Sequence, residues 1–246
     1  MNNYYQPGTE RATKVNQLFA AIAPRYDRIN DLQSFGMHHR WKDRLVKLAG
    51  LKPGDHALDV CCGTGDIAER LAATGASTTG LDFTEEMLEV ARARAQMSET
   101  RKPKAEAGHG LRIQYVQGDA MSLPFEDNSF DGVTVGFGLR NLAEWQVGLR
   151  EMHRVAKPGG RLLVLDFGRP DNALWRSLYF AYLRMIVPVY GKLFCGNWSA
   201  YAYILESLKA YPAQRGVERG MHELKCRDVR VIQFFGGAMS INFGVK

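Results

Sequence analysis

Four acidic residues stand at or beside predicted strand ends, and they are the side chains best suited to hold a polar ligand. They are Asp59, Asp66, Asp82 and Asp119. A carboxylate accepts hydrogen bonds from ribose hydroxyls and amino groups, and it attracts a cation but repels a pyrophosphate. Any one of these acids could instead cap a helix or lie in a solvated turn. The four together favour a site for a nucleoside that carries positive charge.

A glycine-containing turn follows the first of these acids. The segment LDVCCGTGDIA places Gly63, Thr64 and Gly65 shortly after Asp59. A ligand approaches the backbone closely where side chains are absent, so this turn suits a nucleotide. The same letters match a looser dinucleotide fingerprint, and a turn that only links a strand to a helix is the competing interpretation.

The next two strands supply further predicted contacts with the ligand. Asp82 closes the segment STTGLD, where its carboxylate suits the two ribose hydroxyls, and Phe83 and Met87 are assigned to the same site. Asp119 follows the third strand and suits the adenine amino group, with Ala120 beside it.

The elements that would position these residues alternate between short apolar runs and helical patterns. Strands are expected at 56–61, 77–82, 111–116, 130–135 and 161–167, and helices at 65–73, 84–97 and 144–156. This alternation predicts βαβ units and a parallel sheet. Right-handed crossovers make it a doubly wound α/β fold with ligands at the carboxyl ends of the strands.

The flanking segments complete the expected fold. Helices are predicted at 12–22 and 37–49, and two extended segments at 229–235 and 238–245 are joined by Gly236 and Gly237. A Gly-Gly junction suits a tight antiparallel hairpin. The sequence therefore predicts a Rossmann-like, doubly wound sheet of seven strands that ends in an antiparallel hairpin.

The chain of 246 residues fits one domain. We expect four parts within it: an N-terminal helical cap (1–52), a cofactor-binding core (53–170), an aromatic lid or insertion after the fifth strand (171–212), and a C-terminal helix and hairpin (213–246).

Two further segments resemble class I S-adenosylmethionine-dependent methyltransferases. They are the LPF…FD run leading into the fourth strand and the KPGG turn (157–160) before the fifth. The resemblance implies S-adenosylmethionine as the cofactor, in agreement with acids that would face its amino group and sulfonium. The turn in this class usually reads D-x-G-x-G-x-G, and here Cys61 takes the first glycine position. The fold tolerates that departure if Cys61 still belongs to the strand.

Three more segments resemble one family of this class, the quinone C-methyltransferases of menaquinone and ubiquinone biosynthesis. They are FAAIAPRYDRINDLQSFGMHHRWK (19–42), GFGLRNL (136–142) and the tract around YAYILESLKAYP (201–212). The resemblance runs from about Val15 to the hairpin. It implies C-methylation of a prenylated quinol, with demethylmenaquinol favoured as the acceptor.

The resemblance also implies particular cofactor contacts. Thr64, Asp82, Asp119 and Ala120 match cofactor-contact positions of the family. Many members carry Ser where this chain has Gly136, so a hydroxyl contact is missing although the position is still assigned to the cofactor site.

The chemistry of ring methylation suggests the catalytic residues. A ring carbon becomes nucleophilic when a neighbouring phenol loses its proton, so the reduced quinol is the expected substrate. The enzyme must stabilise the phenolate and align carbon, methyl and sulfur. Arg140 is assigned to the oxyanion or to a water that removes the proton, and Asn141 to orienting either one. Both residues could instead cap the next helix.

Two residues of the N-terminal cap are also catalytic candidates. His38 is a candidate base, as is the adjacent His39, because imidazole titrates near neutrality; packing against Trp41 is the alternative. Tyr26 is expected to close over the cofactor, or else to anchor the cap to the core.

The aromatic residues of 171–212 predict a groove for the isoprenoid tail, since a long lipid needs an apolar channel and Trp and Tyr suit a membrane interface. A small helical core or a dimer contact explains them equally well. Peripheral contact with the inner face of a membrane and a homodimer both stay open.

The composition of the chain indicates which partners and which cellular location to expect. The net charge of +6 is mild, and the basic stretch from Arg92 to Lys104 holds no aromatic residue, so no nucleic acid is expected as a partner. The four cysteines form no C-x-x-C pair, so no metal site is predicted. The polar N-terminus has no apolar signal run, which favours the cytoplasm.

Several other functions compete with the favoured one. The acceptor could be a phytylated naphthoquinol, a benzoquinol precursor of ubiquinone, a sterol or a phenolic acid. An NAD-dependent oxidoreductase is opposed by the acids around the turn and by the lack of a Tyr-x-x-x-Lys pair in a catalytic context. A non-catalytic scaffold that binds S-adenosylmethionine within a biosynthetic assembly is the remaining class.

Overall fold

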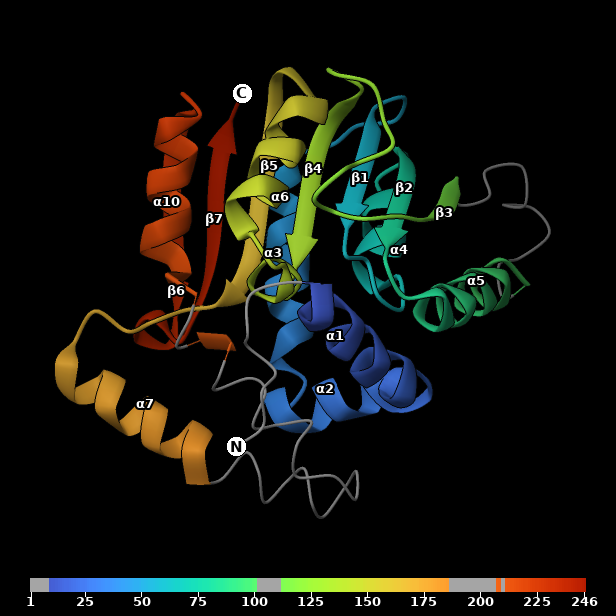
Figure 1. Cartoon of the computed structure of the whole chain (residues 1–246). Helices are drawn as coiled ribbons and strands as arrows, with labels where there is room; N and C mark the ends of the chain where they lie inside the picture. The colour runs from blue at the N-terminus through green and yellow to red at the C-terminus, as the bar shows by residue number, and fades with distance from the viewer. Residues whose placement is uncertain (1–8, 101–111, 186–206, 209–210) are drawn as a thin grey trace.

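The framework of the protein is a seven-stranded sheet with strand order β3-β2-β1-β4-β5-β7-β6 (Figure 1). The computed structural model describes residues 9–100, 112–185, 207–208 and 211–246. The strands are β1 (His56–Val60), β2 (Ser77–Asp82), β3 (Ile113–Gln117), β4 (Phe130–Gly136), β5 (Ala156–Phe167), β6 (Arg227–Phe234) and β7 (Met239–Val245).

The pairing of the strands confirms the predicted doubly wound architecture. Strands β3, β2, β1, β4 and β5 pair in parallel. The C-terminal hairpin folds back so that β7 runs antiparallel between β5 and β6. The strand order reverses between β1 and β4, which opens a crevice at the carboxyl ends of these two strands.

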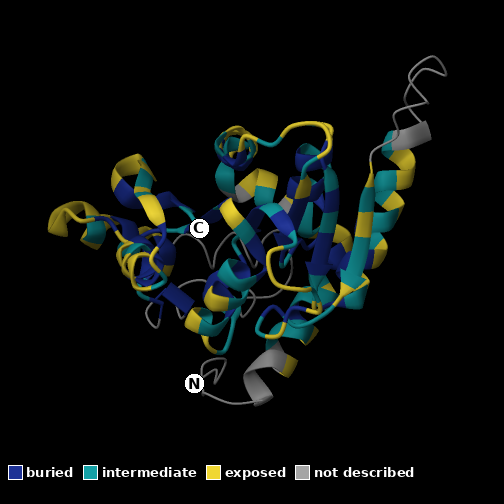
Figure 2. Ribbon diagram, turned by 90° about the horizontal axis from the view of Figure 1, so that it is seen from above, coloured by how far each residue is buried: buried dark blue, intermediate teal, exposed yellow. Residues whose placement is uncertain are grey.

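Helices cover both faces of this sheet. On one face lie α3 (Met37–Ala49) and α4 (Asp66–Ala72), and on the other α6 (Trp145–Val155) and α10 (Ala213–Glu223). Helix α5 (Glu85–Thr100) packs beside β2 and β3. Successive strand residues alternate between the faces, so Leu58 and Ala57 enter different hydrophobic clusters. Buried residues therefore run through the middle of the molecule (Figure 2).

The N-terminal cap consists of α1 (Thr9–Ile22), the 3₁₀ turn η1 (Ala23–Arg25) and α2 (Tyr26–Ser34). Pro24 lies within η1, as expected for a residue that stops a helix. The cap crosses the carboxyl ends of the parallel strands, at the lower edge of the sheet in Figure 1. It is therefore placed to cover a ligand in the crevice.

Two boundaries differ from the sequence prediction. The KPGG segment, expected as a turn before the fifth strand, is a bulge inside β5, because Ala156 already pairs with Phe130 and the register shifts before Arg161 pairs with Gly132. Gly159 supplies the left-handed backbone that this bulge requires, with φ of 84°. Helix α5 also continues to Thr100, three residues beyond its predicted end.

Helix α7 (Ala173–Met185) follows β5 and lies at the same edge of the sheet as the cap (Figure 1). Residues 186–206 and 209–210 of the predicted aromatic insertion lie outside the described residues. Among the described helices, none is both long enough and apolar enough to cross a membrane.

Candidate active site

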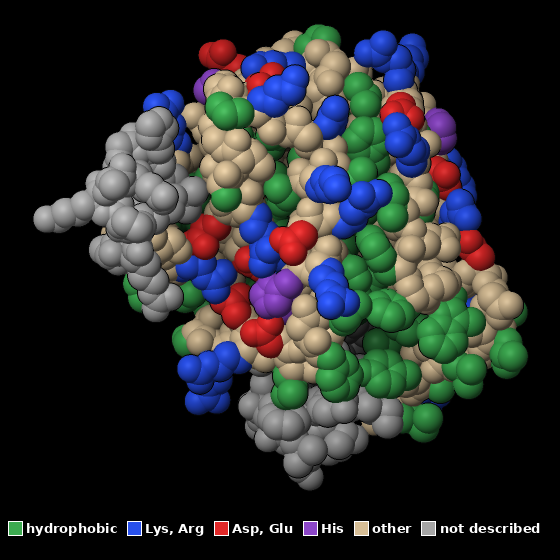
Figure 3. All heavy atoms as spheres, turned by 180° about the vertical axis from the view of Figure 1, so that it is seen from behind, with side chains coloured by type: hydrophobic (Ala, Val, Ile, Leu, Met, Phe, Trp, Pro, Cys, Tyr) green, Lys and Arg blue, Asp and Glu red, His purple; other side chains and the backbone are tan. Residues whose placement is uncertain are grey.

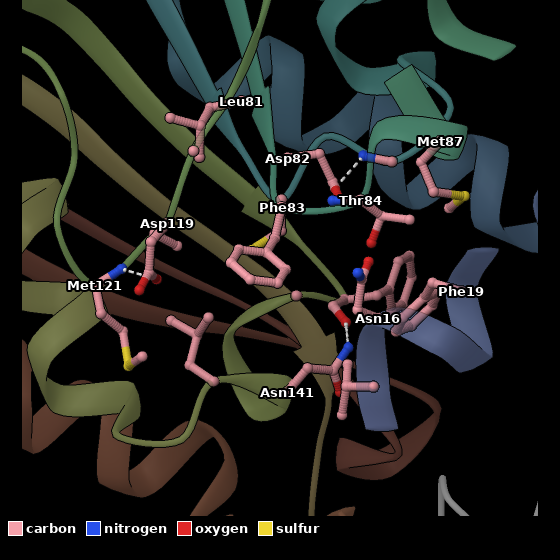
Figure 4. A pocket seen from close by; sticks show the side chains of 18 of the residues that line it. Asn16, Phe19, Leu81, Asp82, Phe83, Thr84, Met87, Asp119, Met121 and Asn141 are labelled. Atoms are coloured by element: carbon pink, nitrogen blue, oxygen red, sulfur yellow. Dashed lines mark hydrogen bonds between the residues drawn. The ribbon is translucent and has the colours of Figure 1, made fainter. Parts of the chain in front are cut away.

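A pocket opens at the carboxyl ends of β1, β2 and β4. Tyr26 also lines it, and Figure 4 shows Asn16 and Phe19 of α1 on one of its sides. It holds about 810 Å³ of space free of protein atoms, part of it open to solvent. The predicted site residues that line it are Tyr26, Gly63, Asp82, Phe83, Met87, Asp119, Ala120, Gly136 and Asn141. The others do not line the pocket: Asp59, Thr64, Gly65 and Arg140 lie behind it, and His38 lies in α3.

Asp82 is oriented by the backbone at the end of β2. The N–H of Gly63 donates to Oδ2 at 2.8 Å, and the N–H of Thr84 donates to Oδ1 at 2.9 Å. Burial raises the pKa of Asp82, and these backbone donors oppose that rise. Each carboxylate oxygen still has a lone pair for a ligand hydroxyl, so Asp82 is preorganised to accept two hydrogen bonds.

Asp119 lies on the opposite side of the pocket, next to β3. Its Oδ1 accepts the N–H of Met121 at 2.8 Å, which fixes the carboxylate against the backbone (Figure 4). Ala120 is buried beside it. Asp82 and Asp119 thus face one cavity from two neighbouring strand ends, as the sequence predicted.

The backbone of the glycine turn has the conformation that its sequence predicts. Gly63 and Gly65 have φ of 55° and 80°, in the left-handed region that side chains disfavour. A Cβ at Gly65 would lie 2.3 Å from the hydroxyl of Tyr115, so no other residue fits there without movement.

The expectation for Cys61 is wrong. Strand β1 ends at Val60, and Cys61 lies beyond it with φ of 54°. The turn therefore begins one residue earlier than expected, at the position where glycine is usual, and this chain places a side chain in a left-handed conformation.

Asp59 lies beneath the pocket rather than in its wall. The hydroxyl of Thr134 donates to its Oδ1 at 2.7 Å, and Oδ2 has no hydrogen-bond partner. Burial raises the pKa of Asp59 from 3.8 to about 7, while the Thr134 hydrogen bond acts against this rise. A protonated carboxyl fits that environment, so Asp59 adds less negative charge to the site than the sequence suggested.

Asp66 is neutralised by two basic residues. Lys42 Nζ lies 2.7 Å from Oδ2, and Arg70 Nε lies 2.9 Å from Oδ1. Despite desolvation, these partners lower the pKa of Asp66. Asp66 therefore ties α3 to α4 and does not line the pocket.

Thr64 connects the glycine turn to the cap. Its hydroxyl donates to Asp27 Oδ1 at 2.8 Å, and the other oxygen of Asp27 pairs with Arg94 of α5. Tyr26, next to Asp27, packs edge-on against Phe19, with ring centroids 6.0 Å apart. The side chains of Thr64 and Asp27 therefore join the cap to the glycine turn.

Helix α1 contributes pocket residues that the sequence reasoning missed. Val15, Asn16 and Phe19 line the pocket, and Figure 4 shows Asn16 and Phe19 on the side away from Asp119. The Oδ1 atom of Asn16 is buried without a hydrogen-bond partner. Their helical spacing was visible in the sequence, but nothing there distinguished a pocket-facing stripe from a core-facing one.

The loop after β4 forms the remaining wall. Phe137 has φ of 61°, and the 3₁₀ turn η3 (Leu139–Asn141) follows it. Asn141 Nδ2 donates to the carbonyl of Phe137 at 3.2 Å. This contact holds the Asn141 side chain at the pocket wall.

Arg140, in the same turn, points away from the pocket wall into the protein. Its Nη1 donates to Asp166 Oδ1 at 2.7 Å and to the carbonyl of Phe137. The guanidinium also lies 4.9 Å from the centre of the Phe167 ring. These contacts hold the loop to the end of β5.

His38 is buried in the cap–α3 junction, outside the pocket lining. The hydroxyl of Ser34 donates to the carbonyl of Asn30, so His38 Nδ1, 2.7 Å away, is the donor to Ser34. Burial lowers the pKa of His38 to about 4, and Lys42 adds to the effect. His38 is therefore neutral at pH 7.

His38 and His39 form a cluster with Asp31 that has metal-ligand residue types. Arg70 Nη2 lies 2.9 Å from His39 Nδ1, so that nitrogen is the acceptor, and His39 Nε2 donates to Asp31 at 2.8 Å. No lone pair of His39 then faces the cluster. The hydrogen bonds account for the arrangement without an ion.

Comparison with known proteins finds relatives over nearly the whole length of the chain. Residues 8–246 match the model of the ubiE/COQ5 methyltransferase family. A demethylmenaquinone methyltransferase of Listeria monocytogenes serotype 4b (strain CLIP80459) is 39% identical over 237 residues, covering 95% of each chain. One from Staphylococcus aureus (strain MRSA252) is also 39% identical over 237 residues, covering 95% of this chain and 93% of its own.

Solved structures share the fold at lower identity. The magnesium protoporphyrin IX methyltransferase ChlM from Synechocystis PCC 6803, with bound SAH, has a TM-score of 0.68 and 20% identity, covering 96% of this chain and 99% of its own. The [4+2]-cyclase SpnF has a TM-score of 0.62 and 19% identity, covering 94% of this chain and 95% of its own. Because a cyclase shares the architecture, the likeness shows the fold and not the reaction.

Proposed function

The chain belongs to the ubiE/COQ5 methyltransferase family, and from that premise we propose that it methylates a ring carbon of a prenylated quinol, with demethylmenaquinol as the acceptor. The predicted family and the predicted enzyme class, a methyltransferase that uses S-adenosylmethionine, are confirmed. The identity of the ring and of its tail is the finer part of the proposal.

The pocket residues fit S-adenosylmethionine. Asp82 would accept the ribose hydroxyls and Asp119 would accept the adenine amino group, because the two carboxylates line one cavity. A Cβ at Gly63 would lie 3.3 Å from Met87 Cε, so the glycine leaves room for the ligand above the turn. Among the described residues that line the pocket there is no Lys or Arg, which disfavours a pyrophosphate and hence a dinucleotide.

One observation carries the proposal: Asn141, Tyr26 and Asn16 line the same pocket as the two carboxylates, so acceptor and cofactor can share it. The high identity to demethylmenaquinone methyltransferases supports the choice of acceptor. When bound, S-adenosylmethionine supplies an electrophilic methyl group on a sulfonium.

The residues of the pocket set the geometry for attack by the ring. Burial raises the pKa of Tyr26, so its hydroxyl stays protonated and can donate to the phenolate oxygen. Asn141, held by Phe137, orients the same oxygen. The ring carbon then bonds to the methyl carbon as the methyl–sulfur bond breaks, and the proton on that ring carbon leaves to solvent.

Arg140 lies behind the part of the pocket wall that Asn141 forms. Its positive charge lowers the pKa of Tyr26, against the larger effect of burial, so the guanidinium field reaches the pocket. In this proposal Arg140 positions the loop that carries Asn141 and favours negative charge on the acceptor. His38 has no part in it.

A panel of acceptors tests the proposal. The purified protein would receive labelled S-adenosylmethionine with reduced demethylmenaquinone, a reduced phytylated naphthoquinone or a reduced benzoquinone precursor of ubiquinone. We expect mass spectrometry to find the new methyl on a ring carbon of demethylmenaquinol at the highest rate. Preference for another ring would move the assignment to that quinol, and cofactor binding without transfer to any acceptor would favour the scaffold.

A further inference from the structure

Helix α7 has two apolar stripes, and the part of the chain that the structure describes buries only one of them. Tyr179 and Leu183, one turn apart, are buried, and the Tyr179 hydroxyl donates to the carbonyl of Ala238 at 3.2 Å. At 100° per residue, the centre of a second apolar stripe lies about 125° away around the helix. This stripe consists of Leu174, Leu178, Tyr182 and Met185, with Trp175 beside it.

This second stripe is exposed to an unusual degree. Leu174 and Met185 retain 73% and 62% of their accessible surface, and Leu178 and Trp175 are exposed as well. Scattered single apolar residues are common on surfaces, but a continuous stripe marks an interaction site.

The exposed stripe continues onto the turn between β6 and β7. The indole N–H of Trp175 donates to the carbonyl of Phe235 at 2.8 Å, and the Phe235 ring is itself exposed. Figure 3, which views the molecule from behind, shows hydrophobic side chains gathered at the end where α7 lies. We name this surface the α7 face: Leu174, Trp175, Leu178, Tyr182, Met185 and Phe235.

The charges on α7 restrict what can cover the face. The helix carries Arg176 and Arg184 and no acidic residue. Arg176 lies on the side of the helix opposite the exposed stripe, but Arg184 lies about 80° from Leu174, at the rim of the stripe. Two copies packed through this face would share a rim that carries only positive charge, whereas an anionic surface would attract Arg184. Tyr and Trp are the aromatic residues that concentrate at the boundary between lipid and water.

We propose that the α7 face docks the protein onto an anionic lipid bilayer, with α7 lying in the plane of the interface. A helix of 13 residues extends only about 20 Å, so it cannot span the membrane. The proposal rests on the proposed function, because a prenylated acceptor resides in the bilayer. Figure 1 places α7 at the same edge of the sheet as the cap, so docking brings the pocket toward the lipid.

Vesicle flotation tests the docking surface. The full chain would be mixed with phosphatidylcholine vesicles, with or without phosphatidylglycerol, and compared with the triple variant Leu174→Gln, Leu178→Gln and Met185→Gln. We expect the wild type to float with the anionic vesicles and the triple variant to bind roughly 100-fold more weakly, because three apolar side chains lose their burial. Met97→Gln, an exposed methionine on α5, is the matched control and should bind like the wild type.

A charge variant supports the test independently of the apolar one. Arg184→Glu reverses an exposed charge on α7 and should weaken binding to the anionic vesicles about tenfold or more. Equal flotation of the wild type and the triple variant, or no flotation of the wild type, would overturn the proposal. So would a dimer in light scattering that the triple variant abolishes without any change in vesicle binding.

Methyl transfer to a tail-less reduced quinol separates this proposal from the proposed function. The triple variant should keep the wild-type rate on that acceptor while losing vesicle binding. Vesicle binding without methylation of any quinol would leave the docking surface standing and refute the proposed function. Methylation of a quinol without vesicle binding by the wild type would support the proposed function and refute the docking surface.

Discussion

Arg140 and Asp166 form a buried ion pair, with Nη1 and Oδ1 2.7 Å apart and the two side chains 5% and 4% exposed. The pair joins the loop after β4 to the end of β5. Two groups of opposite charge in the protein interior depend on each other, because either one alone would be a buried, uncompensated charge.

The first prediction concerns the stability of this pair. Arg140→Met should lower the free energy of unfolding by about 3–5 kcal/mol, since it strands the Asp166 carboxylate. The double variant Arg140→Met/Asp166→Asn should lose less than the sum of the two single changes. Urea denaturation of the four proteins measures this coupling.

A second substitution, compared with Arg140→Met, separates positioning from chemistry at Arg140. Arg140→Lys keeps a charge but not the fork geometry, and kcat should fall while the KM for S-adenosylmethionine changes little, because the loop carrying Asn141 shifts. Full turnover in a folded Arg140→Met protein would remove Arg140 from the mechanism altogether.

The second prediction concerns Asp82. Asp82→Asn keeps the shape but removes the charge and places an amide donor against the ribose hydroxyls or the backbone N–H groups. We expect the Kd for S-adenosylmethionine to rise roughly 10- to 100-fold by calorimetry. Glu86→Gln, an exposed acid on α5 next to this site, is the control, and an equal loss there would refute a specific contact.

The third prediction is a pH dependence of stability that comes from Asp59. Burial raises its pKa from 3.8 to about 7. Between these values the unfolded chain has released the proton while the folded protein keeps it, so the free energy of unfolding falls as the pH rises through this window. Asp59→Asn, which mimics the protonated acid, should remove that fall in the free energy of unfolding, which is on the order of 4 kcal/mol.

Denaturation at several pH values between 4 and 8 measures the effect. Asp131→Asn is the control, because the hydrogen bond from Lys157 lowers the pKa of Asp131, despite desolvation, and moves its titration below the window. An unchanged slope in Asp59→Asn would mean that Asp59 is ionised in the folded protein.

The fourth prediction explains why this chain has glycine where the family often has serine. A Cβ at Gly136 would lie 2.3 Å from Ile67 Cδ1, so the isoleucine occupies the space that a side chain would need. Gly136→Ser should cost about 1–3 kcal/mol of stability through overpacking. Adding Ile67→Val, which removes the clashing methyl, should restore most of it; failure to do so would locate the strain elsewhere.

The fifth prediction concerns Asn16, whose buried Oδ1 has no protein partner. Asn16→Leu should leave the unliganded protein as stable or more so, because it removes a buried Oδ1 that accepts no hydrogen bond from the described residues. Asn16→Leu should nevertheless weaken about tenfold the binding of whichever ligand donates a hydrogen bond to the Asn16 Oδ1 atom. Thermal unfolding and equilibrium binding of S-adenosylmethionine and of the reduced acceptor would show which ligand uses the atom.

The core of the fold was predictable because each strand is a short apolar run bounded by turn residues. Asp82 and Asp119 could be placed at one edge of the sheet for the same reason, since parallel strands bring their carboxyl ends together. The position of Cys61 was not predictable, because one residue decides whether a strand continues or a turn begins. Nor did the sequence show that the C-terminal hairpin inserts β7 against β5.

Interactions between distant segments account for the rest. The partner of Arg140 lies 26 residues away at the end of β5, and Lys42, which neutralises Asp66, comes from α3. The sequence supplied these charges but not their pairing, so it could not separate pocket residues from those that support the pocket. The stripe of α1 facing the ligand depends on how the cap docks, which local spacing does not determine.

The most direct test of the central claim is transfer of a labelled methyl group from S-adenosylmethionine to demethylmenaquinone, offered in its reduced and oxidised forms in parallel. The account predicts labelled menaquinone from the reduced form only, because only the quinol can give a phenolate that activates the ring carbon. Equal labelling of the oxidised form would contradict the phenolate mechanism. No labelling of either form, with S-adenosylmethionine bound, would contradict the assignment of demethylmenaquinol as the acceptor.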